Sequence, residues 1–218
     1  MGDTFNLGWK LAHVPTGLSD ASLLHTYSAE RHLEAKRLVE TDHAWARIMS
    51  APPGQSELDD SAMPRFQKQF IENLEFTGGL AVRYAPSVLS SGAARQDLAT
   101  GQIVGKRFHS APVIRLADAK PMPLGHVAEA DGRWRFYAFA GREDTGAPGG
   151  GMDALCGFLE TDERSPIRRV RRDGQDMDAQ IAMRAIFQQD FQSLRCGAMP
   201  SPLRPAQGRY GLRAFAQV

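Results

Sequence analysis

The sequence lacks the features typical of disulfide-rich, nucleic-acid-binding, membrane and secreted proteins. It contains only two cysteines, Cys156 and Cys196, which are too few and too far apart for a disulfide framework. Lys and Arg total 26 against 25 Asp and Glu, so a net charge of +1 gives no electrostatic basis for binding nucleic acid or an anionic membrane. No run of about 18 apolar residues is present, and no secretory signal precedes the first helical pattern. These absences predict a cytoplasmic protein with no membrane span.

A metal site is also not expected. The sequence has no HExxH motif and no pair of histidines spaced i, i+4, so the usual ligand spacing for zinc is missing. The six histidines are scattered over the chain: His13, His25, His32, His43, His109 and His126. Hydrophobic residues make up 42% and charged residues 23% of the 218 positions, which is typical of a globular protein of one or two domains.

The first third of the chain has helical patterns. Residues 3–14 predict a short helix that ends at Pro15, and a long helix follows, capped by Ser19 or Asp20 and ended by the Pro-Pro-Gly at 52–54. A third helix is expected over residues 60–74. The small, polar residues 87–102 indicate a linker.

After residue 103 the patterns alternate between strands and helices. Strands are predicted at 113–116, at 133–139 and at 167–172, and helices at 152–160 and 177–187. This alternation favours an α/β domain over residues 103–218.

Two stretches of this domain offer weak chemical signals. The glycine-rich residues 146–151 lie between a strand and a helix, where a phosphate cradle would lie, but they lack both the P-loop ending and the GxGxxG spacing. A flexible surface loop is the preferred interpretation. The arginine-rich residues 168–172 could bind an anion, although a solvated strand edge among acidic neighbours is the preferred interpretation there.

The most specific pattern is a set of five stretches in a fixed order. They are DTFNLGWKLA at residues 3–12, LHTYSAER at 24–31, GKRFHSAPVIR at 105–115, DGRWR at 131–135 and GRYGLR at 208–213. Together they resemble the flavoprotein aromatic hydroxylases, in the branch of phenol 2-monooxygenase and 3-hydroxybenzoate 4-monooxygenase. The resemblance covers nearly the whole chain.

This resemblance implies an α/β fold in two parts. Residues 1–86 would be the helical C-terminal end of an FAD-binding and substrate domain, 87–102 the linker, and 103–218 a thioredoxin-like domain associated with dimerisation. That domain lacks redox thiols in the family, and residues 140–144, which follow the predicted strand, contain no cysteine. A thioredoxin- or peroxiredoxin-type enzyme therefore lacks its nucleophile, and both cysteines are expected to be small core residues.

The resemblance also implies where a cofactor would lie. In the family the N-terminal amides of the first helix face the flavin, and a helix N-terminus stabilises the negative charge of reduced flavin. Asp3 and Asn6 are therefore the candidate FAD-binding residues, with a plain N-cap as the alternative and preferred role for Asp3. No catalytic residue is predicted.

Several parts of such an enzyme are missing from these 218 residues. No GxGxxG follows an N-terminal strand, and the resemblance implies that the substrate pocket precedes Met1. We therefore expect the C-terminal part of an FAD- and NAD(P)H-dependent monooxygenase of phenolic aromatics, inactive alone and homodimeric. The alternative is a free-standing, non-redox thioredoxin-like module for dimerisation or interaction. A free-standing module has no reason to keep the first helix, whose apolar face would be left bare, so the first interpretation is preferred.

Overall fold

The computed structural model describes residues 2–50, 67, 70–71, 73–76, 78–108 and 110–213. The chain forms two compact units, residues 1–108 and 109–218. The expected helix over 60–74 and the helix end at 52–54 lie largely outside the described residues. The linker predicted at 87–102 contains turns, bends and the short 3₁₀ helix η2 (Gln96–Leu98), and it groups with the first unit.

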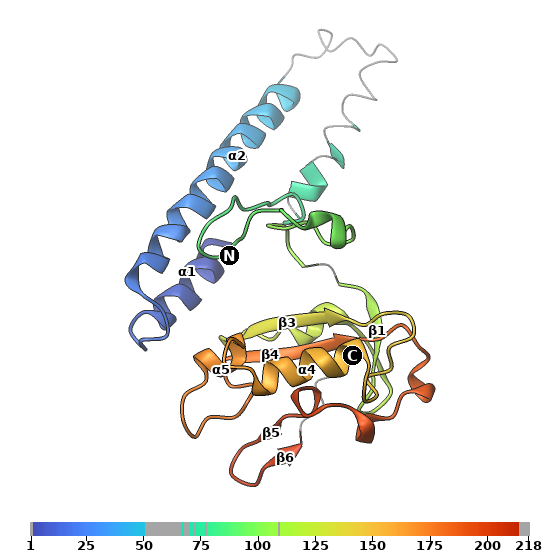
Figure 1. Ribbon diagram of the computed structural model, residues 1–218. Coiled ribbons are helices and arrows are strands. Elements are labelled where there is room, and N and C mark those ends of the chain that lie inside the picture. The colour runs from blue at the N-terminus through green and yellow to red at the C-terminus, as the bar shows by residue number, and fades with distance from the viewer. Residues whose placement is uncertain are drawn as a thin grey trace. The chain divides into compact units, whose positions relative to one another are not determined.

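The first unit is built around a pair of helices. Helix α1 (Gly2–His13) is followed by the 3₁₀ turn η1 (Ala21–Leu24), which leads into the 25-residue helix α2 (His25–Met49). The carboxylate of Asp20 accepts a hydrogen bond from the Ser22 amide and so caps η1, one turn before α2, whose own start at Leu24 has no side-chain cap. Figure 1 shows α1 lying alongside the N-terminal half of α2.

A close backbone approach ends this unit. The Tyr84 amide donates to the carbonyl oxygen of Gly105, and the neighbouring residues Arg83 and Lys106 form an antiparallel bridge. Gly105 has a φ of 84°, and a Cβ on it would collide with the carbonyl oxygen of Tyr84. Glycine is required there for both reasons.

The second unit is an α/β structure, which confirms the predicted class. Strands β1 (Pro112–Arg115) and β2 (Lys120–Pro123) form an antiparallel hairpin that runs into the 3₁₀ helix η3 (Leu124–Val127). Strand β3 (Trp134–Phe139) pairs in parallel with β4 (Ile181–Ile186). Helices α4 (Gly151–Thr161) and α5 (Pro166–Val170) lie in the crossover between them, as a parallel pair requires. Two short strands, β5 (Ala206–Gln207) and β6 (Leu212–Arg213), pair near the end.

The core of this unit lies between the sheet and α4 (Figure 1). Leu159 is 2% exposed and Cys156 is fully buried. The core comprises Ala138, Ala140, Met152, Cys156, Leu159, Ile167, Met183, Ala185, Met199 and Leu203.

Two of the predicted elements were wrong. Residues 177–187 were expected to be a helix, but Ile181–Ile186 form β4, because their pairing with β3 overrides the helix-forming character of Met, Ala and Arg. Residues 167–172 were expected to be a strand, but Pro166–Val170 form helix α5. The Ser165 hydroxyl accepts from the Arg168 amide and Pro166 stands at the first helical position, a Ser-Pro helix start that the strand interpretation missed.

Candidate functional site

Three polar side chains are buried where α1 meets α2. The Lys10 ammonium is fully buried and donates to Glu30 Oε2 at 2.7 Å and to Asn6 Oδ1 at 2.8 Å. Asn6 Nδ2 donates to the same Glu30 oxygen at 2.7 Å. Each member therefore contacts the other two, and the two opposite charges are neutralised inside the helix pair. We call these residues the buried triad.

A second layer of contacts lies at the N-terminal end of α1. Arg31 Nε donates to Asp3 Oδ1 at 2.8 Å, and Arg31 Nη1 donates to the Tyr84 hydroxyl at 3.3 Å. The hydrogen bond from Arg31 holds the pKa of Asp3 below its ordinary value. Burial alone would lower the pKa of Arg31, but its bonds to Asp3 and Tyr84 outweigh burial and raise it. Arg31 is therefore a permanent cation bound to a carboxylate that is ionised at neutral pH.

Both candidate residues from the sequence belong to these two layers. Asn6 is 7% exposed, and its amide group forms hydrogen bonds with Glu30 and Lys10. The side chain of Asp3 is 58% exposed and forms an ion pair with Arg31. Asn6 Nδ2 also lies 3.4 Å from the Tyr84 hydroxyl, so the layers are joined. These contacts hold the N-terminal turn of α1 in place, because its inward-facing polar groups form hydrogen bonds within the protein.

Sequence reasoning did not single out Lys10, Glu30 or Tyr84. Lys10 and Glu30 stand inside two of the five stretches that carry the resemblance, so a search for opposite charges between those stretches would have found the pair. Tyr84 lies 53 residues from Arg31, and nothing in the local sequence signals their contact.

The glycine-rich loop already has anionic partners within the protein. The Asp144 carboxylate accepts from the Gly146 amide at 2.9 Å and from the Met152 amide at 2.6 Å, at the start of α4. Asp153 accepts from the Gly149 amide at 2.9 Å. A phosphate at this helix N-terminus would have to displace a carboxylate that the chain itself supplies. The geometry favours a surface loop over a phosphate cradle.

Neither cysteine is placed as a nucleophile, but only Cys156 is the core residue expected, and Cys196 lies outside the core. Cys156 is fully buried on α4, and burial raises the pKa of its thiol to about 12. Cys196 is half-buried with its pKa raised by burial, and its Sγ lies 3.6 Å from the carbonyl oxygen of Leu116. Both thiols are free. A thiolate is the reactive form of cysteine, and neither environment favours one.

Among the described residues, no group of three or more His, Cys, Asp and Glu side chains is arranged to hold a metal ion. Within the same part of the chain, no helix combines the length and apolar character needed to cross a membrane. The arginines at 168–172 are exposed, on α5 and just after it, and not on a strand edge.

Comparison with known proteins gives matches to both units. Residues 82–218 match the family described as "Phenol hydroxylase, C-terminal dimerisation domain", and residues 1–42 match "FAD binding domain". The chain is 47% identical to 3-hydroxybenzoate 4-monooxygenase of Comamonas testosteroni over 100% of its own length and 34% of the relative. It is 33% identical to FAD-dependent monooxygenase terD of Aspergillus terreus over 99% of the chain and 36% of that relative. The chain thus spans about a third of the length of these relatives. Because the dimerisation-domain match covers more than half of the chain, the chain belongs to the phenol hydroxylase family of FAD-dependent aromatic hydroxylases and corresponds to their C-terminal region.

Proposed function

We propose that this chain is the C-terminal part of a flavin-dependent monooxygenase that hydroxylates phenolic aromatics of the 3-hydroxybenzoate or phenol type with NAD(P)H and O₂. The observation that carries the proposal is the 47% identity to a 3-hydroxybenzoate 4-monooxygenase, which runs through both units without a break in coverage. On this proposal the 218 residues alone do not catalyse hydroxylation, because the dinucleotide-binding motif is not among them.

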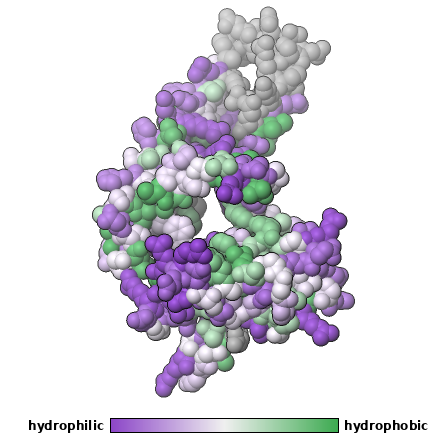
Figure 2. Space-filling model, viewed as in Figure 1, coloured by the Kyte–Doolittle hydropathy of each residue, from purple (hydrophilic) through white to green (hydrophobic). Residues whose placement is uncertain are grey.

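The surface of the helix pair is that of an element which packs against a larger domain. Large apolar side chains on α1 and α2 face outward: Phe5 is 72% exposed, and Leu33 and Leu38 are 59% and 56% exposed. Figure 2 shows hydrophobic side chains on the exposed surface of this pair. Exposed apolar surface of this kind marks a face that another structure covers. The remainder of an FAD domain is the cover we propose.

In the whole enzyme the N-terminal turn of α1 would face the flavin, with Asp3 and Asn6 as the residues nearest to it. FAD, when bound, supplies the redox chemistry that activates oxygen. The fit is through the helix end: its backbone amides are hydrogen-bond donors, and its dipole favours negative charge. The side chain of Asn6 is engaged by Glu30 and Lys10, so Asn6 would act by holding this turn in place.

Residues 103–218 would form a thioredoxin-like domain that pairs two copies of the chain. The parallel β3–β4 pair with α4 against one face is consistent with that arrangement. The match to a dimerisation domain supports a homodimer. The domain would act without redox chemistry, since the Cys156 thiol is buried with a raised pKa.

The experiment that tests this function measures the size and flavin content of the native protein. An antibody raised against residues 201–213 should capture, from cells that carry the gene, a polypeptide well above the 23.9 kDa of this chain. That polypeptide should carry FAD and consume NAD(P)H when a phenolic acid is added. A flavin-free band at 23.9 kDa would instead favour the free-standing dimerisation module.

A further inference from the structure

The β3–β4 sheet has an unusual second face. Ala138 and Ala185, which are paired in register, point into the core beside α4. Since side chains alternate along a strand, the adjacent residues Tyr137 and Arg184, also paired in register, belong to the opposite face, together with Arg135. Parallel sheets are normally covered by apolar residues on both faces, so arginines on this face need a reason.

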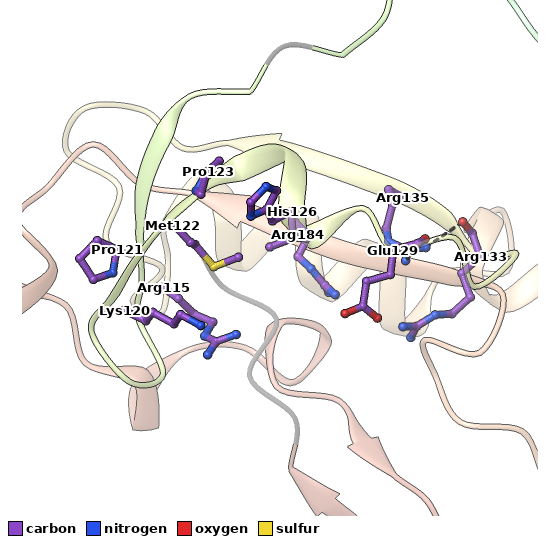
Figure 3. A pocket seen from close by; sticks show the side chains of 11 residues that line it. Arg115, Lys120, Pro121, Met122, Pro123, His126, Glu129, Arg133, Arg135 and Arg184 are labelled. Carbon is purple, nitrogen blue, oxygen red and sulfur yellow. Dashed lines mark hydrogen bonds between the residues drawn. The ribbon is translucent and has the colours of Figure 1, made fainter. Parts of the chain in front are cut away.

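These arginines line a pocket of about 440 Å³. The pocket lies between this sheet face and the β1–β2 hairpin with η3, all within the second unit. Figure 3 shows Arg115 and Lys120 of the hairpin, and Arg184 of β4, reaching into the same space. Its cationic lining consists of Arg115, Lys120, Arg133, Arg135 and Arg184. Met122 and the prolines of β2 form an apolar wall.

The nearby carboxylates neutralise only part of this charge. Arg115 pairs with Asp118, and Asp131 accepts from both Arg133 and Arg135 at 2.7–2.8 Å. Asp178 also pairs with Arg133, and Glu129 lines the pocket. Five lining cations therefore have four carboxylates in or beside the pocket, which His126 also lines.

Arg184 is one of two lining cations that belong to no ion pair of the described residues, the other being Lys120. Arg184 Nη1 donates to the carbonyl oxygen of Met183 at 3.0 Å. Burial lowers the pKa of Arg184, and the charges of Arg135 and Arg133 lower it further. The side chain of Arg135 is 9% exposed, and its Nε is buried with no hydrogen-bond partner in the described part of the chain. Asp178 offsets part of the positive charge around Arg184, but the pocket still holds more cations than there are carboxylates nearby.

We propose that this pocket binds a small oxyanion, carboxylate or phosphate, through the guanidinium of Arg184, with Arg115 and Lys120 closing over it from the hairpin. A guanidinium presents two parallel N–H donors that match both kinds of oxyanion. The pocket volume suits a small molecule, and the Met122 wall would contact its carbon part. This inference goes beyond the proposed monooxygenase function and does not depend on it.

The test is calorimetric titration of the full 218-residue chain with sodium phosphate and, separately, with sodium benzoate, at constant ionic strength set with NaCl. Saturable binding of one probe is expected, and the probe that binds distinguishes the phosphate source from the carboxylate source. Arg184→Gln should weaken binding about 10-fold or more. Arg171→Gln is the matched control, because it removes the same charge from an exposed position just after α5.

Arg184→Lys keeps the experiment decisive if Arg184→Gln does not fold. It retains the charge but loses the paired donors, so binding should weaken several-fold while circular dichroism stays unchanged. The proposal is overturned if neither anion binds at about 10 mM, or if Arg184→Gln and Arg171→Gln bind equally well. It is also overturned if neither anion binds and Arg184→Gln instead converts a dimer to monomers, which would assign Arg184 to an interface with a second copy.

Discussion

The two units bury opposite kinds of side chain at their helices. Where α1 meets α2 in the first unit, the buried residues are polar or charged: Asn6, Lys10, His13, Thr26 and Glu30. Where α4 meets the sheet in the second unit, they are Met152, Cys156 and Leu159. Several large apolar residues of the helix pair are exposed, among them Phe5, Leu33 and Leu38.

The two kinds of buried residue have different effects: apolar residues stabilise the fold, and a buried ion pair determines how two helices pack. Burial of apolar surface is the main source of folding free energy, and the second unit has a core of that kind. A buried ion pair adds little net stability, because desolvation of the two charges offsets their attraction. Breaking a buried ion pair is costly only when one charge is removed and the other stays buried without a partner. The buried triad therefore fixes how α1 lies on α2, while the exposed apolar side chains of the pair, such as Phe5, contribute little buried area to its stability.

The largest expected effect comes from breaking the buried triad on one side. Lys10→Met leaves the Glu30 carboxylate buried without its cation, at a cost of about 3–5 kcal/mol. Hydrogen exchange read by mass spectrometry should show loss of protection in α1 and the first turns of α2, with β3, β4 and α4 unchanged. Lys10→Met combined with Glu30→Leu should restore much of the protection.

The control for this variant is Lys36→Met: the Lys36 side chain is 68% exposed, and its ammonium lies 3.9 Å from Glu40. It should leave exchange in α1 unchanged, since exposed ion pairs contribute little. Unchanged protection in Lys10→Met would show that α1 is held by other contacts and would remove the contrast between the units.

A smaller effect is expected at the start of α4 in the second unit. Asp144→Ala removes the acceptor for the Gly146 and Met152 amides and should cost about 1–2 kcal/mol. Urea unfolding followed by circular dichroism, with hydrogen exchange to locate the change, measures it. Glu143→Ala changes the same charge at an exposed neighbouring position and should have no effect. An equal loss in both variants would mean that charge, and not capping of the loop, is what matters there.

Local signals made much of this fold predictable from the sequence. The helical patterns after Asp20 and at 152–160 and the alternation at 134–139 each act within a few residues, and α2, β3 and α4 follow from them. Strand β4 was missed because its state depends on pairing with β3 across 47 residues, as in Trp134 with Ile181. Its residues taken alone do not exclude a helix.

Sequence likewise indicated the site on the first helix and did not indicate the arginine-lined pocket. Asp3 and Asn6 came from the resemblance, and the structure shows that their partners Lys10, Glu30 and Arg31 lie in two of the stretches that carry it, residues 3–12 and 24–31. The arginine pocket could not be predicted, because Arg115, Arg135 and Arg184 meet only after the hairpin and the parallel pair have formed. The sequence of one strand does not indicate which residues of another strand will lie beside its charged side chains.

The smallest expected effect tests the outer layer of the helix pair. The pKa of Asp3 is lowered by the hydrogen bond from Arg31, so the pair stabilises the folded state fully above the ordinary pKa of 3.8 and loses this contribution as pH falls below it. Asp3→Asn should therefore reduce the protection of α1 at pH 7 by less than about 1 kcal/mol, because the carboxylate is mostly exposed. The difference between Asp3→Asn and the parent chain, corrected for intrinsic exchange rates, should shrink from pH 5 to pH 2 and in 1 M NaCl. Asp42→Asn, exposed on α2, is the control and should show no such trend. A loss as large as that of Lys10→Met would mean that the Asp3–Arg31 pair, and not the buried triad, holds α1 against α2.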